Sequence, residues 1–242
     1  METEDHMFSL PVANRAEQYP LHPTKIIAMG LNYRDHIAES HSVNVQGFTQ
    51  EIPKEPVLFP KTPNVLIPPG DAIVIPAFLR DYAFDDPRVD YEGELAFIVG
   101  DRCKNVSKEE ALGHVFGYTC MNDVSQRNLQ TGDRSGWFRG KSLDTFGPVG
   151  PCIVLAEEIG DPQSLDILCR LNGKVVQQSN TRHMIWGIRE ILAFVSRNFT
   201  LEEGDIITTG TPSGVGRLKD GDVVEVEIEK IGVLRNPVVE ER

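Results

Sequence analysis

Short apolar runs, broken by Gly, Pro and Asp, recur along most of the chain and predict a fold rich in β-strands. Each run has the length of one short strand. The expected strands are residues 25–30, 71–75, 91–99, 115–122, 152–155, 167–171, 206–209 and 223–229. The pattern therefore predicts a mainly β domain of the α+β class, with few short helices.

Three segments have helical rather than strand periodicity: residues 32–40, 108–112 and 184–199. Ser107 and Glu110 have the spacing of a capping box at the start of the second segment. Apolar residues of the third segment fall on one helical face, which predicts a helix packed against the core: Ile188, Ile191, Leu192 and Val195.

One stretch, residues 40–56, is polar and aperiodic, and we expect it to be a loop that covers a site as a lid. Elsewhere no linker-like composition divides the chain. We therefore expect one catalytic domain over residues 23–242, preceded by a short N-terminal extension, residues 1–22.

Composition narrows the classes of function. The chain has 24 Lys plus Arg against 36 Asp plus Glu, and this net charge of -12 argues against nucleic acid and anionic membranes as partners. No apolar run is long enough to span a bilayer, and the acidic start does not resemble an export signal, so a cytoplasmic location is expected. The cysteines lack C-x-x-C spacing and are expected to be buried free thiols: Cys103, Cys120, Cys152 and Cys169.

Candidate chemistry begins in the stretch VDYEGELAFIVG, where strand periodicity places Glu92 and Glu94 on one face. Such a pair can also be a solvated strand edge, because Glu225, Glu227 and Glu229 alternate in the same manner. Asp123 differs in that it ends another apolar strand. Three carboxylates without a His or Cys partner would form a hard oxygen site for Mg, Mn or Ca.

Other polar residues suit a substrate site. His36 and Glu39 share one helical face, as a general base and its orienting carboxylate would, although an exposed His beside an exposed Glu is the alternative. The turn GTPSGVG at residues 210–216 can direct backbone N–H groups at an anion, but it lacks the Lys of a nucleotide P-loop. Lys141 lies among turn residues, either as a cation that faces the substrate or as an ordinary loop lysine.

Several separated segments resemble the fumarylacetoacetate hydrolase family, in particular its small members that act on acylpyruvates or related 2-oxo acids. The resemblance runs from about residue 25 to 238. The segments, in order, are GLNYRDHIAE, PVLFPKTPNVL, VDYEGELAFIVG, GYTCMNDVSQRNLQ, GKSLDTFGPVGP, LNGKVVQQSNTRHMIW and LEEGDIITTGTPSGVG.

This resemblance implies a mixed β-sandwich roll, a homodimer, and a Mg²⁺ or Mn²⁺ ion held by Glu92, Glu94 and Asp123. It also implies catalytic roles for His36 as base, Glu39 as its orienting partner and Lys141 as the active-site lysine. Three further residues match substrate-contacting positions: Arg127, Gln130 and Thr211, the last of which would meet the substrate carboxylate.

The reaction implied is hydrolysis of a carbon–carbon bond in a 4-acyl-2-oxo acid. Decarboxylation of oxaloacetate and isomerisation of a dienoate 2-oxo acid are alternatives on the same metal platform, and a non-catalytic 2-oxo acid binder or Ca²⁺-binding protein is a third. Residues 82–88 form an apparent insertion, and Gln126 and Asn128 stand where the family pattern has Ala and Asp. These departures affect the pocket rim, so the substrate's acyl group is the least determined feature.

Overall fold

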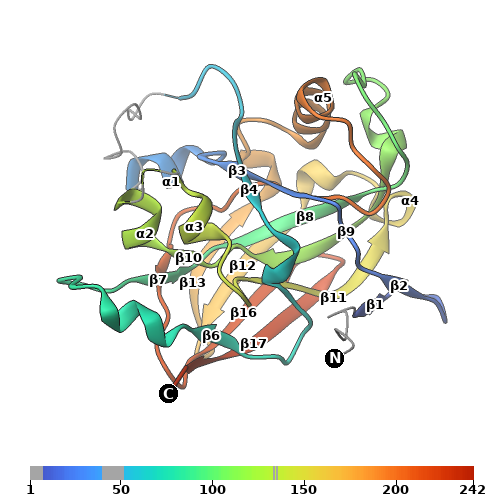
Figure 1. Cartoon of the computed structure of the whole chain (residues 1–242). Coiled ribbons are helices and arrows are strands. Elements are labelled where there is room, and N and C mark those ends of the chain that lie inside the picture. Colours follow the sequence, from blue (N-terminus) through green and yellow to red (C-terminus); the bar gives the residue numbers. More distant parts are fainter. Residues whose placement is uncertain (1–7, 40–51, 133, 135) are drawn as a thin grey trace, which may run out of the picture.

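The computed structural model describes residues 8–39, 52–132, 134 and 136–242, and its centre is a curled seven-stranded sheet (Figure 1). In spatial order its strands are β4 (Val57–Lys61), β3 (Ile26–Gly30), β14 (Ile206–Thr208), β8 (Gly93–Val99), β9 (Val115–Asn122), β11 (Gly147–Leu155) and β5 (Leu66–Ile67). The edge strands β4 and β5 are separated only by the 3₁₀ turn η2 (Pro63–Val65). The sheet therefore curls so that its two edges come close together.

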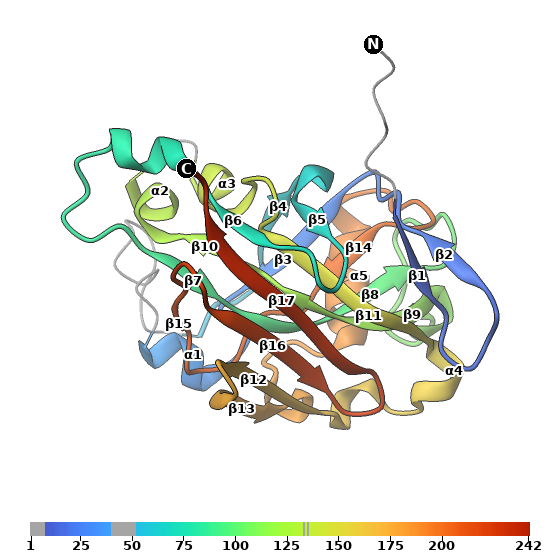
Figure 2. The same cartoon turned by 90° about the horizontal axis from the view of Figure 1, so that it is seen from below.

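A five-stranded sheet packs on one side of the curled sheet, as Figure 2 shows, and contacts β8, β9 and β11. Its strands, in spatial order, are β13 (Lys174–Asn180), β12 (Asp166–Leu171), β16 (Val223–Ile228), β17 (Gly232–Glu240) and β6 (Ile73–Ile75). Leu95 and Phe97 of β8 pack with Val226 of β16 in one core cluster. This sandwich of two sheets agrees with the expected roll.

Two small sheets complete the strands. The hairpin of β1 (Ser9–Pro11) and β2 (Gln18–Pro20) places Leu10 in the core within the curl. A three-stranded sheet joins β10 (Ser125–Gln126), β7 (Val89–Tyr91) and β15 (Gly216–Arg217). Strand β7 leads into β8, and β9 leads into β10. These two segments of the chain therefore pass between the small sheet and the curled sheet beside each other.

Three short helices gather on one side of the molecule in both views: α1 (Arg34–Glu39), α2 (Arg127–Gly132) and α3 (Phe138–Lys141). The remaining helices are α4 (Ala156–Ile159), α5 (Ile188–Asn198) and the 3₁₀ turns η3 (Ala77–Asp81), η4 (Ala111–His114), η5 (Pro162–Ser164) and η6 (Thr181–His183). Within the described ranges no helix is both long and apolar enough to cross a membrane.

The sequence predictions for the elements are largely confirmed. Every expected strand has a counterpart, but the one expected at 152–155 begins already at Gly147, and the one expected at 91–99 is interrupted at Glu92. The helix expected at 108–112 is wrong, because residues 108–110 form a turn and a 3₁₀ turn follows at 111–114. The capping box itself is present: the Glu110 N–H donates to the Ser107 hydroxyl at 3.3 Å, and the Ser107 N–H donates to the Glu110 carboxylate at 3.4 Å. The helix expected from residue 184 begins only at Ile188, since Met184 still pairs with Tyr33 in a β-bridge.

The cysteine prediction is also confirmed for the most part. All four thiols are free, and Cys103, Cys120 and Cys169 are buried, whereas Cys152 is half-buried.

Candidate metal and substrate site

Three carboxylates meet where two neighbouring strands are interrupted. Glu92 lies between β7 and β8, and Asp123 follows β9. The Asp123 N–H donates to the Glu92 carbonyl at 2.9 Å, and the Glu92 N–H donates to the Asn122 side-chain oxygen at 2.9 Å. These bonds hold the two strand interruptions side by side. As a result, one carboxylate oxygen from each of Glu92, Glu94 and Asp123 lies within 4.8 Å of the others.

Lysines and an arginine already pair with two of these carboxylates. The Lys141 ammonium, at the end of α3, donates to Glu92 and to Asp123 at 2.6 Å each. Lys61 reaches Asp123, also at 2.6 Å, from β4 on the facing edge of the curled sheet. The Arg127 guanidinium pairs with Glu92. Lys141 therefore lies in the site on a helix rather than among turn residues.

The third carboxylate, Glu94, has a different environment. It accepts a hydrogen bond from the Gly210 N–H at 2.9 Å, and no cationic side chain in the described ranges forms an ion pair with it. Burial, together with the negative charges of Asp123 and Glu92, raises the pKa of Glu94 well above its usual value. Burial would also raise the pKa of Glu92, but Arg127, Lys141 and His36 outweigh it and hold that pKa below its usual range.

This unequal electrostatics fits a bound divalent cation. The donor atoms are hard carboxylate oxygens, which Mg²⁺ and Mn²⁺ prefer. An added cation would relieve the repulsion that Glu94 experiences from its two neighbours, which burial makes severe. Glu92, Glu94 and Asp123 are all buried, so their carboxylates are positioned by the fold before any ion arrives.

A narrow cavity opens onto the carboxylates. Its lining combines walls from Phe59 and Trp137 with the polar residues expected from the sequence: His36, Glu92, Glu94, Arg127, Gln130, Lys141 and Thr211. The structure thus brings these residues together, while their individual roles stay predictions. The side chain of Glu39 and residues 40–51 of the expected lid lie outside the described residues.

Helix α2 presents Arg127 and Gln130 to this cavity. The Arg127 guanidinium donates to the Gln130 side-chain oxygen at 2.9 Å and to Asp90 at 2.8 Å. Together with its pairing to Glu92, these contacts fix the guanidinium plane. Asp90 was not singled out from the sequence, and its partner Arg127 is too distant along the chain to give a local signal.

Residues 82–88, the apparent insertion, are hydrogen-bonded to the region where α2 begins. The Asn128 side-chain oxygen accepts from the Arg88 N–H at 2.9 Å, and its amide donates to the Asp86 carbonyl at 3.1 Å. Gln126 donates to Asn128 at 3.0 Å and accepts from the Leu129 N–H at 2.7 Å. Asn128, supported by Gln126, therefore anchors segment 82–88 to the start of α2.

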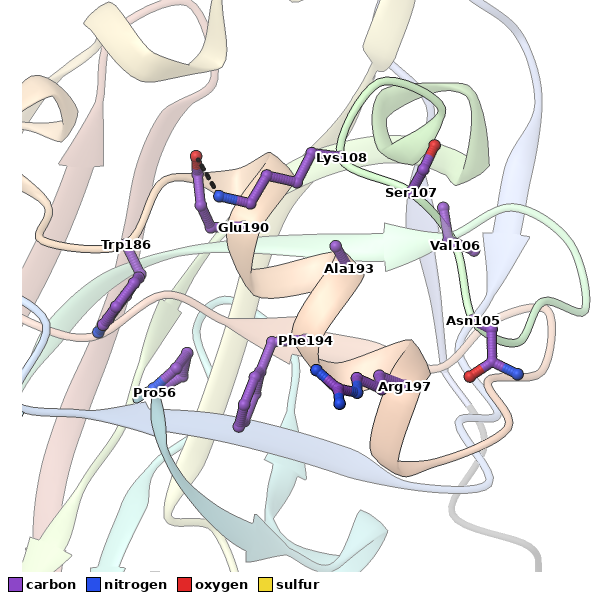
Figure 3. A pocket seen from close by; sticks show the side chains of 10 residues that line it. All are labelled: Pro56, Asn105, Val106, Ser107, Lys108, Trp186, Glu190, Ala193, Phe194 and Arg197. Carbon is purple, nitrogen blue, oxygen red and sulfur yellow. Dashed lines mark hydrogen bonds and ion pairs between the residues drawn. The ribbon is translucent and has the colours of Figure 1, made fainter. Parts of the chain in front are cut away.

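A second, more open hollow lies between α5 and residues 105–108 (Figure 3). Trp186 and Phe194 form much of its wall, and Lys108 pairs with Glu190 across it at 3.4 Å. The described residues that line it include none of the converging carboxylates and no histidine. The chemistry of the molecule is therefore assigned to the narrow cavity rather than to this hollow.

Comparisons with known proteins agree with this geometry. The family model for the fumarylacetoacetate (FAA) hydrolase C-terminal domain matches residues 25–239. A mitochondrial oxaloacetate tautomerase of Bos taurus is 42% identical over 243 residues, which cover 95% of this chain and 72% of the relative.

Two solved structures share the fold. A 5-carboxymethyl-2-hydroxymuconate delta-isomerase from Mycobacterium smegmatis is 38% identical with a TM-score of 0.79, over 92% of this chain and 81% of that one. A fumarylpyruvate hydrolase from Pseudomonas aeruginosa, in complex with Mn²⁺ and pyruvate, is 28% identical with a TM-score of 0.83, over 97% of each chain. The chain belongs to the fumarylacetoacetate hydrolase family.

Proposed function

We propose that the protein is a divalent-metal-dependent enzyme that interconverts the keto and enol forms of a small 2-oxo acid, with oxaloacetate as the expected substrate. The observation that carries this proposal is the convergence of three buried carboxylates beside the Lys141 ammonium. The names of two relatives, an oxaloacetate tautomerase and a delta-isomerase, support it, because both reactions move a proton next to a carbonyl group.

Glu92, Glu94 and Asp123 would hold the ion, Mg²⁺ or Mn²⁺. When bound, the ion supplies a Lewis acid that favours the enolate of a 2-oxo acid. Lys141 adds a fixed positive charge: burial would lower its pKa, but Asp123 and Glu92 raise it above the usual value, so the side chain stays protonated. Its ammonium group stabilises negative charge that develops on the substrate oxygen.

His36 is the side chain that we assign to the proton transfer. It is buried and lines the cavity with Glu92 and Lys141. In the keto-to-enol direction its imidazole removes a proton from C3 of oxaloacetate, the C2 oxygen gains a proton, and the double bond moves from C2–O to C2–C3. The reverse steps restore the ketone, so the reaction needs no further reactant.

The charges near the cavity suit a dicarboxylate. Four buried carboxylates, Asp90, Glu92, Glu94 and Asp123, face the buried cations Lys61, Lys141 and Arg127. A divalent ion added to this set leaves a net positive charge, which attracts a dianion such as oxaloacetate.

The test follows the ultraviolet absorbance of enol-oxaloacetate as it converts to the ketone, with Mg²⁺ or Mn²⁺ and after EDTA treatment. Metal-dependent acceleration above the rate of the metal alone is expected. An equal rate with and without protein would overturn the proposal. If Ca²⁺ then raised the thermal stability while the protein left every member of a panel of 2-oxo acids unchanged, the protein would be a non-catalytic Ca²⁺-binding protein.

Hydrolysis of a 4-acyl-2-oxo acid is the second candidate. It is favoured by the match to fumarylpyruvate hydrolase along nearly the whole chain. Here His36 would activate water for attack on the distal carbonyl, and the products would be a carboxylic acid and pyruvate. Pyruvate release from an acylpyruvate, measured beside the oxaloacetate assay, decides between the two reactions, and His36→Ala should lower hydrolysis far more than any decarboxylation of oxaloacetate, which needs no water.

A further inference from the structure

Gln177 is a buried amide on a strand that also carries exposed side chains. It lies on β13, where Val175 is 43% exposed and Gln178 is exposed, yet Gln177 itself is only 1% exposed. Its side-chain oxygen accepts from the Gly93 N–H at 3.0 Å, and its nitrogen donates to the Thr211 hydroxyl at 2.9 Å and the Pro212 carbonyl at 2.8 Å.

These three bonds allow only one orientation of the amide. A flipped Gln177 would set its N–H groups against the Gly93 N–H and its oxygen against the Pro212 carbonyl. Gly93 lies between the carboxylates Glu92 and Glu94, so one side chain joins the ligand strand to the loop that carries Thr211.

The same contacts determine what Thr211 can offer a substrate. Its hydroxyl donates its single proton to the Gly93 carbonyl at 2.9 Å and accepts from Gln177. Towards the cavity, which Thr211 lines, the hydroxyl therefore has only a lone pair. A carboxylate is also only an acceptor, so the two cannot hydrogen-bond while this arrangement holds.

The backbone of the same loop carries a second donor group, the Thr211 N–H. Within the described ranges no hydrogen bond from the Thr211 N–H is found, whereas the preceding Gly210 N–H is used by Glu94. The loop is packed tightly on β13, because a Cβ atom at Gly214 would come within 2.0 Å of the Val176 carbonyl oxygen. Gly214 also has a φ of +94°, so this close approach is built into the backbone.

We propose that Gln177 is a positioning residue that ties the Thr211 loop to the ligand strand, so that the Thr211 N–H, and not its hydroxyl, binds the carboxylate of the substrate. The proposal rests on the proposed function for the identity of that substrate. It specifies which atom of Thr211 meets the carboxylate, which the sequence left open.

The experiment is a double-mutant cycle in the full chain with Gln177→Met and Thr211→Val, which removes the hydroxyl but keeps the N–H. Gln178→Met on the same strand is the matched control. Each variant is assayed for KM and kcat with oxaloacetate and Mn²⁺, for the affinity of oxalate by calorimetry, and for thermal unfolding.

Each single variant should raise KM and lower the affinity for oxalate about tenfold, while kcat changes less than about threefold. The reason is that the lost bond anchors the bound substrate and takes no part in the proton transfer. In the double variant, KM and oxalate affinity should differ by less than about twofold from those of either single variant, since both changes release the same loop. Gln178→Met should match the parent protein. A merely structural role would instead lower thermal stability without this division between KM and kcat.

Two results would overturn the proposal: effects that multiply in the double variant, or a large loss in Thr211→Val alone with parental values in Gln177→Met, which would make the hydroxyl the donor. If the parent protein does not act on oxaloacetate, the proposed function fails, but oxalate and Mn²⁺ titrations still decide the role of Gln177. Should Gln177→Met fail to fold, Gln177→Glu, which keeps an acceptor for Gly93, takes its place.

Discussion

Two strands of this molecule carry the same alternation of glutamates, with different results. Glu92 and Glu94 are 4% and 1% exposed. On β16, Glu225 and Glu227 remain partly exposed and pair with Arg235 and Arg170. The local sequence is similar, but β8 lies at the centre of the curled sheet, whereas the glutamates of β16 lie on the side turned away from the core.

The difference shows that burial, and not the alternation, makes a carboxylate pair into a candidate metal site. In water the β16 glutamates keep ordinary ion pairs that contribute little. In the interior Glu92 pairs with Arg127 and Lys141, whereas Glu94 lacks a cationic partner among the described residues. Four predictions test this contrast.

The largest effect is expected on turnover. Glu94→Gln keeps the shape of the side chain but removes one charge of the proposed metal site, so kcat/KM for oxaloacetate should fall at least about 1,000-fold, equivalent to about 4 kcal/mol. Glu227→Gln, the matched change on β16, should stay within about twofold of the parent protein. Steady-state kinetics at saturating Mn²⁺ measures both, and equal values for the two variants would refute the contrast.

The cationic partners should differ in a similar way. Lys61 and Asp123 have fully buried side chains, so Lys61→Met leaves a buried charge and should lower the free energy of unfolding of the metal-free protein by about 3 kcal/mol. Arg170→Met removes a partly exposed partner of Glu227 and should cost less than about 1 kcal/mol. Urea unfolding compares them, and a loss of similar size in both variants would count against the distinction.

Without metal, removal of the repelled carboxylate should stabilise the fold. Because the pKa of Glu94 is raised, its ionised form opposes folding at neutral pH, so Glu94→Gln should raise the free energy of unfolding by about 1 to 2 kcal/mol. With saturating Mn²⁺ the parent protein should instead be the more stable of the two, since only the parent protein is stabilised by tight metal binding. Thermal unfolding in EDTA and in Mn²⁺ compares the stability of the variant with that of the parent protein under both conditions. A variant less stable than the parent protein in EDTA would contradict the electrostatic argument.

The smallest effect concerns the apolar side of β16, where Val226 pairs with Cys169 of β12. Burial raises the pKa of the Cys169 thiol to about 12, while an unfolded thiol ionises near about 8.5. Its stabilising contribution is complete below that unfolded value and is lost as pH rises towards the folded one. Between pH 7 and 9 the ionisation of this thiol should lower the free energy of unfolding by about 0.8 kcal/mol. In Cys169→Ala this pH-dependent loss should be absent, which unfolding measured across this pH range checks.

The sequence was sufficient for features that local patterns encode. Alternating apolar residues predicted β8, β9 and β16. The shared strand face of Glu92 and Glu94, together with Asp123 at the end of another strand, predicted a site of three carboxylates. Lys61 could not be found in this way, because its partner Asp123 lies 62 positions along the chain and meets it only after the sheet curls.

Gln177 shows the same limit in another form. Polar residues in KVVQQSN suggest a solvated strand, yet Val175 is exposed and Gln177 is buried, the reverse of their hydropathy. Tertiary packing against the Thr211 loop determines this arrangement, since the buried amide is fully hydrogen-bonded there. The ends of helices were predicted least well, as the segment at 108–112 shows.

The most direct test of the account is calorimetric titration of Mn²⁺ into the metal-free protein, with and without oxalate as a mimic of the chelating 2-oxo acid. We expect one Mn²⁺ ion per chain and tighter Mn²⁺ binding when oxalate is present; by reciprocity, oxalate should bind more tightly when Mn²⁺ is present. Both effects should be absent in Glu94→Gln and retained in Glu227→Gln. Oxalate affinity that does not change with Mn²⁺, or Mn²⁺ binding that survives unchanged in Glu94→Gln, would contradict it.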